Sequence, residues 1–167
     1  MAHLLRLSIK PRTPNEYGLP KHAVSHLDID VTGAAGDYNN YRTRKLKGDP
    51  DQAIMFLTDE VIQQLRREGW PVEQGDFGEN LTVGGVAESE LGVGVQLEVG
   101  PVLLEISKTC DPCTELGVLP YLGTARRAEF IRTTRGRRGW YARVLRPGSI
   151  TLDSPVRLHP VAREVAG

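Results

Sequence analysis

Short stretches in which apolar and polar residues alternate run along the chain and predict a structure made largely of β-strands. Leu4–Ile9 and Ala23–Val31 are the first two stretches. In the second, Leu27, Ile29 and Val31 alternate with polar residues. A period of two is typical of a strand that buries one face and exposes the other. We therefore expect one strand over each stretch.

Similar apolar runs predict further strands in the rest of the chain. They cover Ala53–Leu57, Leu81–Val83, Val95–Val99, Val102–Ser107, Trp140–Leu145, Ile150–Leu152 and Val156–Leu158. Gly100 and Pro101 separate two of these runs, and a two-residue turn of this kind favours a β-hairpin.

A helical pattern is clearest from Asp59 to Glu68. Thr58 precedes it as a preferred N-cap residue, apolar side chains recur on one face, and Gly69 ends it. A second helix is expected over Thr124–Thr134, and a short helical turn is expected to begin near Thr114.

Turn-forming residues are frequent, with 18 glycines and 11 prolines among 167 residues. Pro11–Pro20 and Thr32–Asp51 are expected to be loops, the second long and exposed. Short strands at close spacing with few helices indicate a mostly-β fold, a closed or partly open β-barrel with a few short helices. The length fits one domain over residues 1–167.

The charges of the chain balance, with 21 Lys and Arg against 21 Asp and Glu. No overall field attracts nucleic acid or an acidic membrane, so we expect neither as a partner. The sequence shows no secretory signal and no apolar run long enough to span a bilayer. These features predict a cytoplasmic protein.

Both cysteines lie in one segment, Cys110 and Cys113. A thiolate is a soft nucleophile, and a pair at this spacing can do redox chemistry, bind a metal or carry sulfur. Alternatively, both are small buried apolar residues. The Asp111-Pro112 turn between them favours a functional role. A zinc ion bound by the two cysteines is a further alternative, although the chain lacks a second closely spaced pair of Cys or His ligands.

A glycine-rich segment, Gly75–Asn80, leads directly into a predicted strand. Gly75 and Gly78 allow positive φ angles and let backbone N–H groups face a ligand, which Glu79 and Asn80 could orient by hydrogen bonds. The alternative is an ordinary loop in which the Asn80 side chain bonds its own backbone.

Six arginines lie between positions 126 and 138. Their planar guanidinium groups could hold a phosphate or another oxyanion, although a solvated helix face explains most of them. Arg137 and Arg138 stand apart because Trp140 and Tyr141 follow them closely.

Five of these motifs occur in an order that resembles the MOSC family, the domain named after the C-terminal part of molybdenum-cofactor sulfurases. They are Gly36-Asp37 followed by Arg42, Gly48–Ile54, Gly75–Thr82, Pro112-Cys113 and Arg138–Val144. The resemblance covers almost the whole chain and is closest to the small stand-alone members.

The resemblance implies a β-barrel that binds a molybdenum cofactor, with Cys113 as the catalytic cysteine that carries sulfur or coordinates molybdenum. Cys110 is then an accessory thiol. Some relatives act in detoxifying N-hydroxylated purine bases, so a small molecule is the implied substrate. The implied cofactor-binding residues are Asp37, Arg42, Gly78, Glu79, Asn80, Arg137, Arg138 and Tyr141.

Two positions depart from the family pattern. Asn39 or Asn40 stands where many relatives have histidine, and Gln52 stands where arginine is usual. The pyridoxal-phosphate desulfurase domain of some relatives is absent from this sequence, so sulfur would come from a partner cysteine desulfurase. Two other functions stay open: a binding module that presents Gly33–Gly48 to a partner reductase, and a dithiol redox protein.

Overall fold

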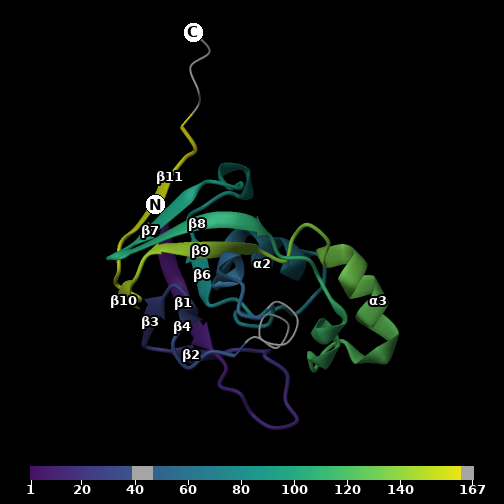
Figure 1. Cartoon of the computed structure of the whole chain (residues 1–167). Coiled ribbons are helices and arrows are strands. Elements are labelled where there is room, and N and C mark those ends of the chain that lie inside the picture. Colours follow the sequence, from purple (N-terminus) through teal and green to yellow (C-terminus); the bar gives the residue numbers. More distant parts are fainter. Residues whose placement is uncertain (39–46, 163–167) are drawn as a thin grey trace.

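A large mixed sheet forms the body of the computed structural model, which describes residues 1–38 and 47–162 (Figure 1). Within these residues the sheet has eight strands in the order β11-β7-β8-β9-β5-β6-β1-β2. Neighbouring strands are antiparallel except β5 and β6, which are parallel. The strands are β1 (His3–Ile9), β2 (His22–Val24), β5 (Ile54–Thr58), β6 (Leu81–Gly84), β7 (Gln96–Val99), β8 (Val102–Thr109), β9 (Trp140–Arg146) and β11 (Val156–His159).

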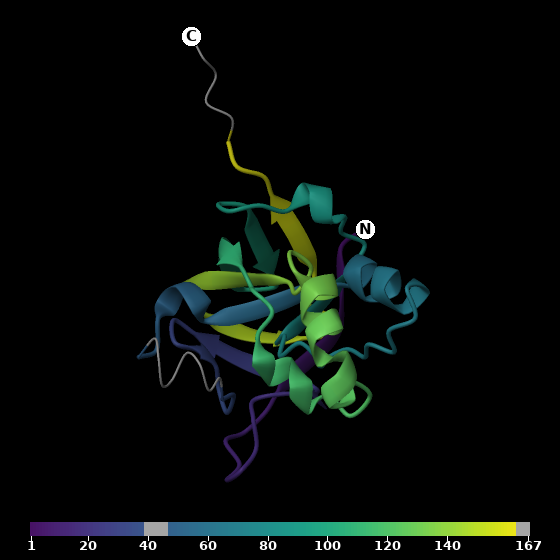
Figure 2. The same ribbon diagram turned by 90° about the vertical axis from the view of Figure 1, so that its right-hand side faces the viewer.

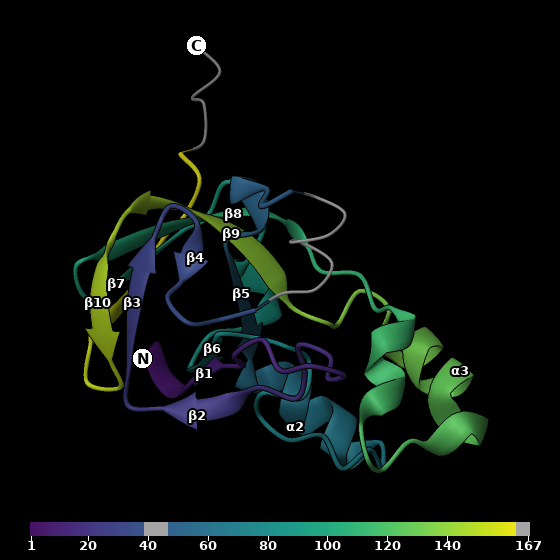
Figure 3. The same cartoon turned by 60° about the horizontal axis from the view of Figure 1, so that its bottom comes forward.

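A smaller sheet lies beside the large one at the end that carries β7 (Figure 3). Its strand order is β10-β3-β4, with β3 (His26–Asp30), β4 (Gly33–Ala34) and β10 (Gly148–Thr151). Between β9 and β10 there is a single residue, Pro147, and the chain changes from one sheet to the other at this point.

Two α-helices and three short 3-10 helices complete the described elements. They are α2 (Asp59–Arg67), α3 (Gly123–Thr134), η1 (Pro50–Gln52), η2 (Glu88–Glu90) and η3 (Thr114–Val118). The Thr58 hydroxyl accepts a hydrogen bond from the Val61 N–H at 3.5 Å and caps α2 as expected. Figure 2 shows α3 beside η3, and in Figure 1 α3 lies on the side of the molecule opposite β10.

Two hydrophobic cores result from this arrangement. The first lies between the two sheets and contains the alternating residues Leu27 and Ile29. The second joins α2, η3 and α3, and its aromatic centre is Phe130, packed against Trp70 and Phe77. Cys110 belongs to this second core, whereas Cys113 lines a cavity.

The structure confirms the mostly-β prediction but not a closed barrel. The large sheet ends at β11 and β2, and the described residues contain no pairing between these two strands. The single strand predicted over Ala23–Val31 is also wrong. It is divided at Ser25 into β2 and β3, which belong to different sheets, and Val31 is 57% exposed. The hairpin of β7 and β8 is confirmed.

Candidate functional site

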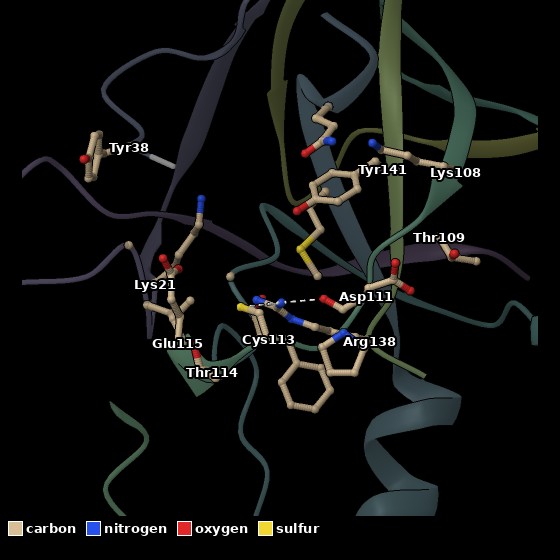
Figure 4. Close-up of a pocket in the computed structure, with 17 residues that line it drawn as sticks. Lys21, Tyr38, Lys108, Thr109, Asp111, Cys113, Thr114, Glu115, Arg138 and Tyr141 are labelled. Atoms are coloured by element: carbon tan, nitrogen blue, oxygen red, sulfur yellow. Dashed lines mark hydrogen bonds between the residues drawn. The ribbon is translucent and has the colours of Figure 1, made fainter. Parts of the chain in front are cut away.

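A cavity of about 470 Å³ lies where the large sheet meets η3 (Figure 4). Segments far apart in the sequence contribute its walls, including the loop before β2, β5, the end of β8, β9 and the loop that carries the cysteines. Its lining residues are Gly18, Leu19, Lys21, Tyr38, Gln52, Met55, Phe77, Gly78, Lys108, Thr109, Asp111, Pro112, Cys113, Thr114, Glu115, Arg138 and Tyr141.

Cys113 faces this cavity from the N-cap position of η3. Its side chain is half-buried, and its sulfur accepts a hydrogen bond from Arg138 Nη1 at 3.3 Å. The predicted helical turn from Thr114 is therefore present, and a guanidinium lies next to the thiol. A ligand in the cavity would lie within reach of this sulfur.

Arg138 is only 6% exposed and joins two loops. Nη1 also donates to the Asp111 carbonyl at 2.8 Å, and Nη2 donates to the Phe77 carbonyl at 3.2 Å. Nε is buried without a hydrogen-bond partner among the described residues. Burial alone would lower the pKa of this guanidinium, but the sulfurs of Cys110 and Cys113 hold it above its ordinary value. Arg138 is thus a buried, permanent cation beside the thiol.

Cys110 differs from Cys113 because it is 1% exposed and does not line the cavity. Burial raises the pKa of its thiol above the ordinary value. A buried thiol of this kind is unreactive, so the two cysteines have different environments despite their spacing.

Asn80, Asp37 and Lys21 form a network behind the cavity wall. Asn80 Nδ2 donates to Asp37 Oδ2 at 2.9 Å and to the Ser8 carbonyl at 3.2 Å, and its Oδ1 accepts from the Met55 N–H at 3.2 Å. Asp37 also forms an ion pair with Lys21. Because Asn80 bonds distant segments, it does not close a local turn. The network fixes the buried Lys21 ammonium at the edge of the cavity.

Close contact between two backbone segments explains why Gly75 is required. Its φ is +93°, and a Cβ atom there would lie 2.6 Å from the Lys21 carbonyl. The Lys21 N–H donates to the Gly75 carbonyl at 2.9 Å. The glycine therefore allows the loop to hold Lys21 in place.

Glu79 is completely buried and does not line the cavity. Its carboxyl accepts hydrogen bonds from the N–H groups of Gly75 at 2.5 Å and Phe77 at 3.2 Å. These N–H groups therefore form hydrogen bonds within the loop and do not face a ligand, although the sequence had suggested that they would. Burial raises the pKa of Glu79 to about 7, although the hydrogen bonds oppose the change.

The structure brings most of the predicted site residues to one region. Gly78, Cys113, Arg138 and Tyr141 line the first cavity, and Asp37, Asn80 and Tyr141 line a second cavity of about 510 Å³ beside it. Arg137 lies outside both: its guanidinium donates to the Glu68 carboxylate at 2.6 and 2.9 Å. Arg42, Asn39 and Asn40 lie outside the described residues, as does half of the Gly33–Gly48 loop.

Two cavity residues, Lys21 and Met55, were missed by the reasoning from sequence. Lys21 and Met55 lie in segments with no polar motif, and only the fold brings them to the site. Lys108, a charged neighbour of the cysteines in the sequence, also lines the cavity, and its ammonium lies 5.9 Å from the centre of the Tyr141 ring.

Neither a metal cluster nor a membrane helix was found in the part of the chain that the structure describes. No group of three or more His, Cys, Asp or Glu side chains there could hold a metal ion. No helix among residues 1–38 and 47–162 is long and apolar enough to cross a membrane.

The fold and the site define a mostly-β domain with a cavity-facing cysteine beside a buried arginine. Residues 43–157 match the MOSC domain, so the chain belongs to the MOSC domain family. Protein YiiM of Escherichia coli (strain K12) is 31% identical over 138 residues, which are 79% of this chain and 58% of that protein.

Two further proteins are similar to this chain. The uncharacterized protein YflK of Bacillus subtilis (strain 168) is 30% identical over 115 residues, 66% of this chain and 49% of that protein. The chain therefore spans about half of the length of these curated relatives. The crystal structure of the YUAD protein from Bacillus subtilis superposes with a TM-score of 0.79 at 20% identity, over 96% of this chain and 97% of that one, and so shares the fold.

Proposed function

We propose that this domain binds a molybdenum-pterin-type cofactor in the first cavity, with Cys113 as the protein ligand of the metal. The Cys113 sulfur faces a cavity of about 470 Å³ and accepts a hydrogen bond from a buried arginine. The volume is within the range of small-molecule sites, about 300–1,000 Å³.

The residues present fit such a group. Thiolate is a soft ligand, suited to a transition metal, and Cys113 can supply one such bond while the cofactor brings the others. Lys21, Lys108 and Arg138 provide positive charge at the cavity for the anionic parts of the cofactor. The buried Nε of Arg138 has no acceptor in the described residues, so an oxygen or sulfur of a bound group could satisfy it.

Each residue has a separate task in this proposal. Arg138 holds the Cys113 sulfur and pairs its negative charge, while the ion pair with Asp37 holds the Lys21 ammonium in position. Tyr141 lines both cavities and presents an aromatic face to a planar ligand. When bound, the cofactor supplies two-electron reduction chemistry, for which N-hydroxylated compounds are the proposed substrates.

A separate reductase is the proposed electron donor for such a reduction. The only two thiols of the chain are Cys110 and Cys113, and Cys110 is buried away from the cavity. The pair is therefore poorly placed to deliver electrons to a ligand there. Both cysteines are free, and we propose the reducing cytoplasm as the compartment.

A second function is favoured by the half-buried position of Cys113. In this alternative the Cys113 thiolate attacks the outer sulfur of a persulfide on a cysteine desulfurase. A new S–S bond forms on Cys113, and the desulfurase thiolate leaves. Arg138 would pair with the terminal sulfur of the resulting persulfide.

Metal analysis tests the cofactor function. The protein is produced in molybdate-rich medium, and its molybdenum and pterin contents are measured for wild type, Cys113→Ser and Cys110→Ser. We expect molybdenum in wild type and in Cys110→Ser but a large loss in Cys113→Ser. Equal molybdenum in all three proteins would exclude Cys113 as a ligand.

Intact mass tests the sulfur-carrier alternative. The protein is incubated with a cysteine desulfurase and cysteine, and the added mass is measured before and after a thiol reductant. A reducible sulfur adduct on wild type that is absent from Cys113→Ser supports this function. An equal adduct on Cys113→Ser, or none on wild type, excludes it.

A further inference from the structure

Gln52 lies at the junction of the two cavities and lines both. It is the last residue of η1 and is 4% exposed. Met55 and Tyr141 are shared by the two cavities in the same way. The three side chains therefore form a common wall that a ligand in either cavity would touch.

The backbone that carries Gln52 is held firmly by the sheet. Arg143 Nε of β9 donates to Asp51 Oδ1 at 2.9 Å, and the Ser107 hydroxyl of β8 donates to the Asp51 carbonyl. The Gln52 N–H donates to the Asp49 carbonyl at 3.1 Å. These contacts fix the position of the side chain without using its amide.

The Gln52 amide has no hydrogen-bond partner within residues 1–38 and 47–162. Asn80, the other amide at this place, is fully used: its Oδ1 accepts from the Met55 N–H, and its Nδ2 donates to Ser8 and Asp37. Among the described residues, Arg138 Nε is the one fully enclosed polar side-chain atom without a partner, so the Gln52 amide is open to the cavities and can pair with a ligand there.

We propose that Gln52 recognises the cyclic amide or amidine edge of a planar heterocycle that contacts Met55 and Tyr141. A side-chain amide presents one acceptor and one donor in a plane, and it pairs with a neighbouring donor and acceptor on a ring. The Tyr141 ring and the Met55 thioether suit the flat face of such a ring. Figure 4 shows Tyr141 above Cys113 at the cavity.

This inference rests on the proposed function, because it names the part of the bound molecule that Gln52 recognises. Two sources carry the required edge: the pterin of a cofactor and the purine of a substrate. Metal-free probes separate them. Neopterin represents the first source, inosine the second, and quinoxaline is a planar ring system without the donor–acceptor edge.

Dissociation constants are measured by ligand-observed NMR titration of the purified protein with each probe. We expect wild type to bind at least one of neopterin and inosine more tightly than quinoxaline. Gln52→Met, which keeps the length but removes both polar atoms, should weaken that binding roughly 5- to 100-fold and leave quinoxaline unchanged. Tighter neopterin binding identifies the cofactor as the source, and tighter inosine binding identifies the substrate.

Gln52→Glu gives a result that a purely structural role would not produce. A carboxylate accepts from the adjacent N–H and amino groups of neopterin but opposes the carbonyl of inosine. Neopterin binding should therefore persist while inosine binding is lost.

The inference is overturned if wild type binds neither probe better than quinoxaline, or if Gln52→Met binds both as wild type does. Failure of the proposed function has a different signature. Molybdenum would then be absent from wild type, or equal in Cys113→Ser, while Gln52-dependent binding of the metal-free probe persists.

Discussion

Replacing Glu79 with glutamine should change how the stability of the domain depends on pH. The carboxyl is fully buried, and its pKa is raised from 4.5 to about 7, chiefly by burial. In the folded state it thus holds its proton more tightly than in the unfolded chain. The protonated carboxyl therefore stabilises the folded state, fully below pH 4.5, and this contribution is lost as the pH rises through 7.

The size of the effect follows from the two pKa values. A tenfold change in proton affinity corresponds to about 1.4 kcal/mol, so the free energy of unfolding should fall by about 3 kcal/mol between about pH 4.5 and pH 8. Burial also raises the pKa of Asp76, which adds a smaller fall in the same direction.

Glu79→Gln removes the larger part of this pH dependence but lowers the free energy of unfolding by an amount that does not depend on pH. One of the N–H groups of Gly75 and Phe77 would face the amide NH₂ and lose its acceptor, which costs about 1–3 kcal/mol at every pH. The variant should therefore be less stable than wild type at about pH 5, and the difference should shrink or reverse at about pH 8.

The free energy of unfolding of both proteins is measured by urea titration at a series of pH values from about 5 to about 8. Tryptophan fluorescence is the signal. Trp70 is buried in the second core and reports its loss. Parallel curves of stability against pH for the two proteins would refute the assigned role of Glu79.

Three further predictions concern the surroundings of the thiol. Arg138→Met should lower the free energy of unfolding by about 2–4 kcal/mol in urea titrations, because the buried Phe77 carbonyl and the Asp111 carbonyl lose their donor; an unchanged midpoint would contradict this. Tyr121→Phe removes the 2.8 Å hydrogen bond to Asp76 and should lower Tm by about 2–4 °C in calorimetry; a Tm equal to that of wild type would show that the bond contributes nothing. Iodoacetamide should label Cys113 but not Cys110 in the folded protein, giving one adduct by mass spectrometry; labelling of both thiols would contradict the burial of Cys110.

Local patterns predicted the elements whose signals lie within a few residues. The helix at Asp59–Arg67 has its cap, its apolar face and its terminating glycine in one segment. The hairpin of β7 and β8 likewise depends on the short turn at Gly100. Such features are set by nearby residues, so the sequence alone could reveal them.

The division of Ala23–Val31 could not be predicted in this way. The alternation continues past Ser25, yet the chain leaves one sheet and enters another there. Only the pairing of β2 with β1 and of β3 with β10 separates the two strands, and pairing between distant segments leaves no local signal.

The candidate site shows the same limit. The motifs indicated Cys113, Arg138 and the Gly75–Asn80 loop, which the fold brings together. They did not indicate that Glu79 turns inward, because its partners are backbone N–H groups whose direction depends on the loop conformation. Lys21 is placed by contacts with Asp37 and Gly75 across the fold, so its sequence neighbours gave no indication.

The bond between Cys113 and molybdenum is the central claim, and X-ray absorption at the molybdenum edge tests it most directly. Wild type and Cys113→Ser are prepared from molybdate-rich cells and compared at equal metal concentration. We expect one sulfur neighbour fewer around molybdenum in the variant. An identical sulfur shell in both proteins, or no molybdenum in wild type, would contradict it.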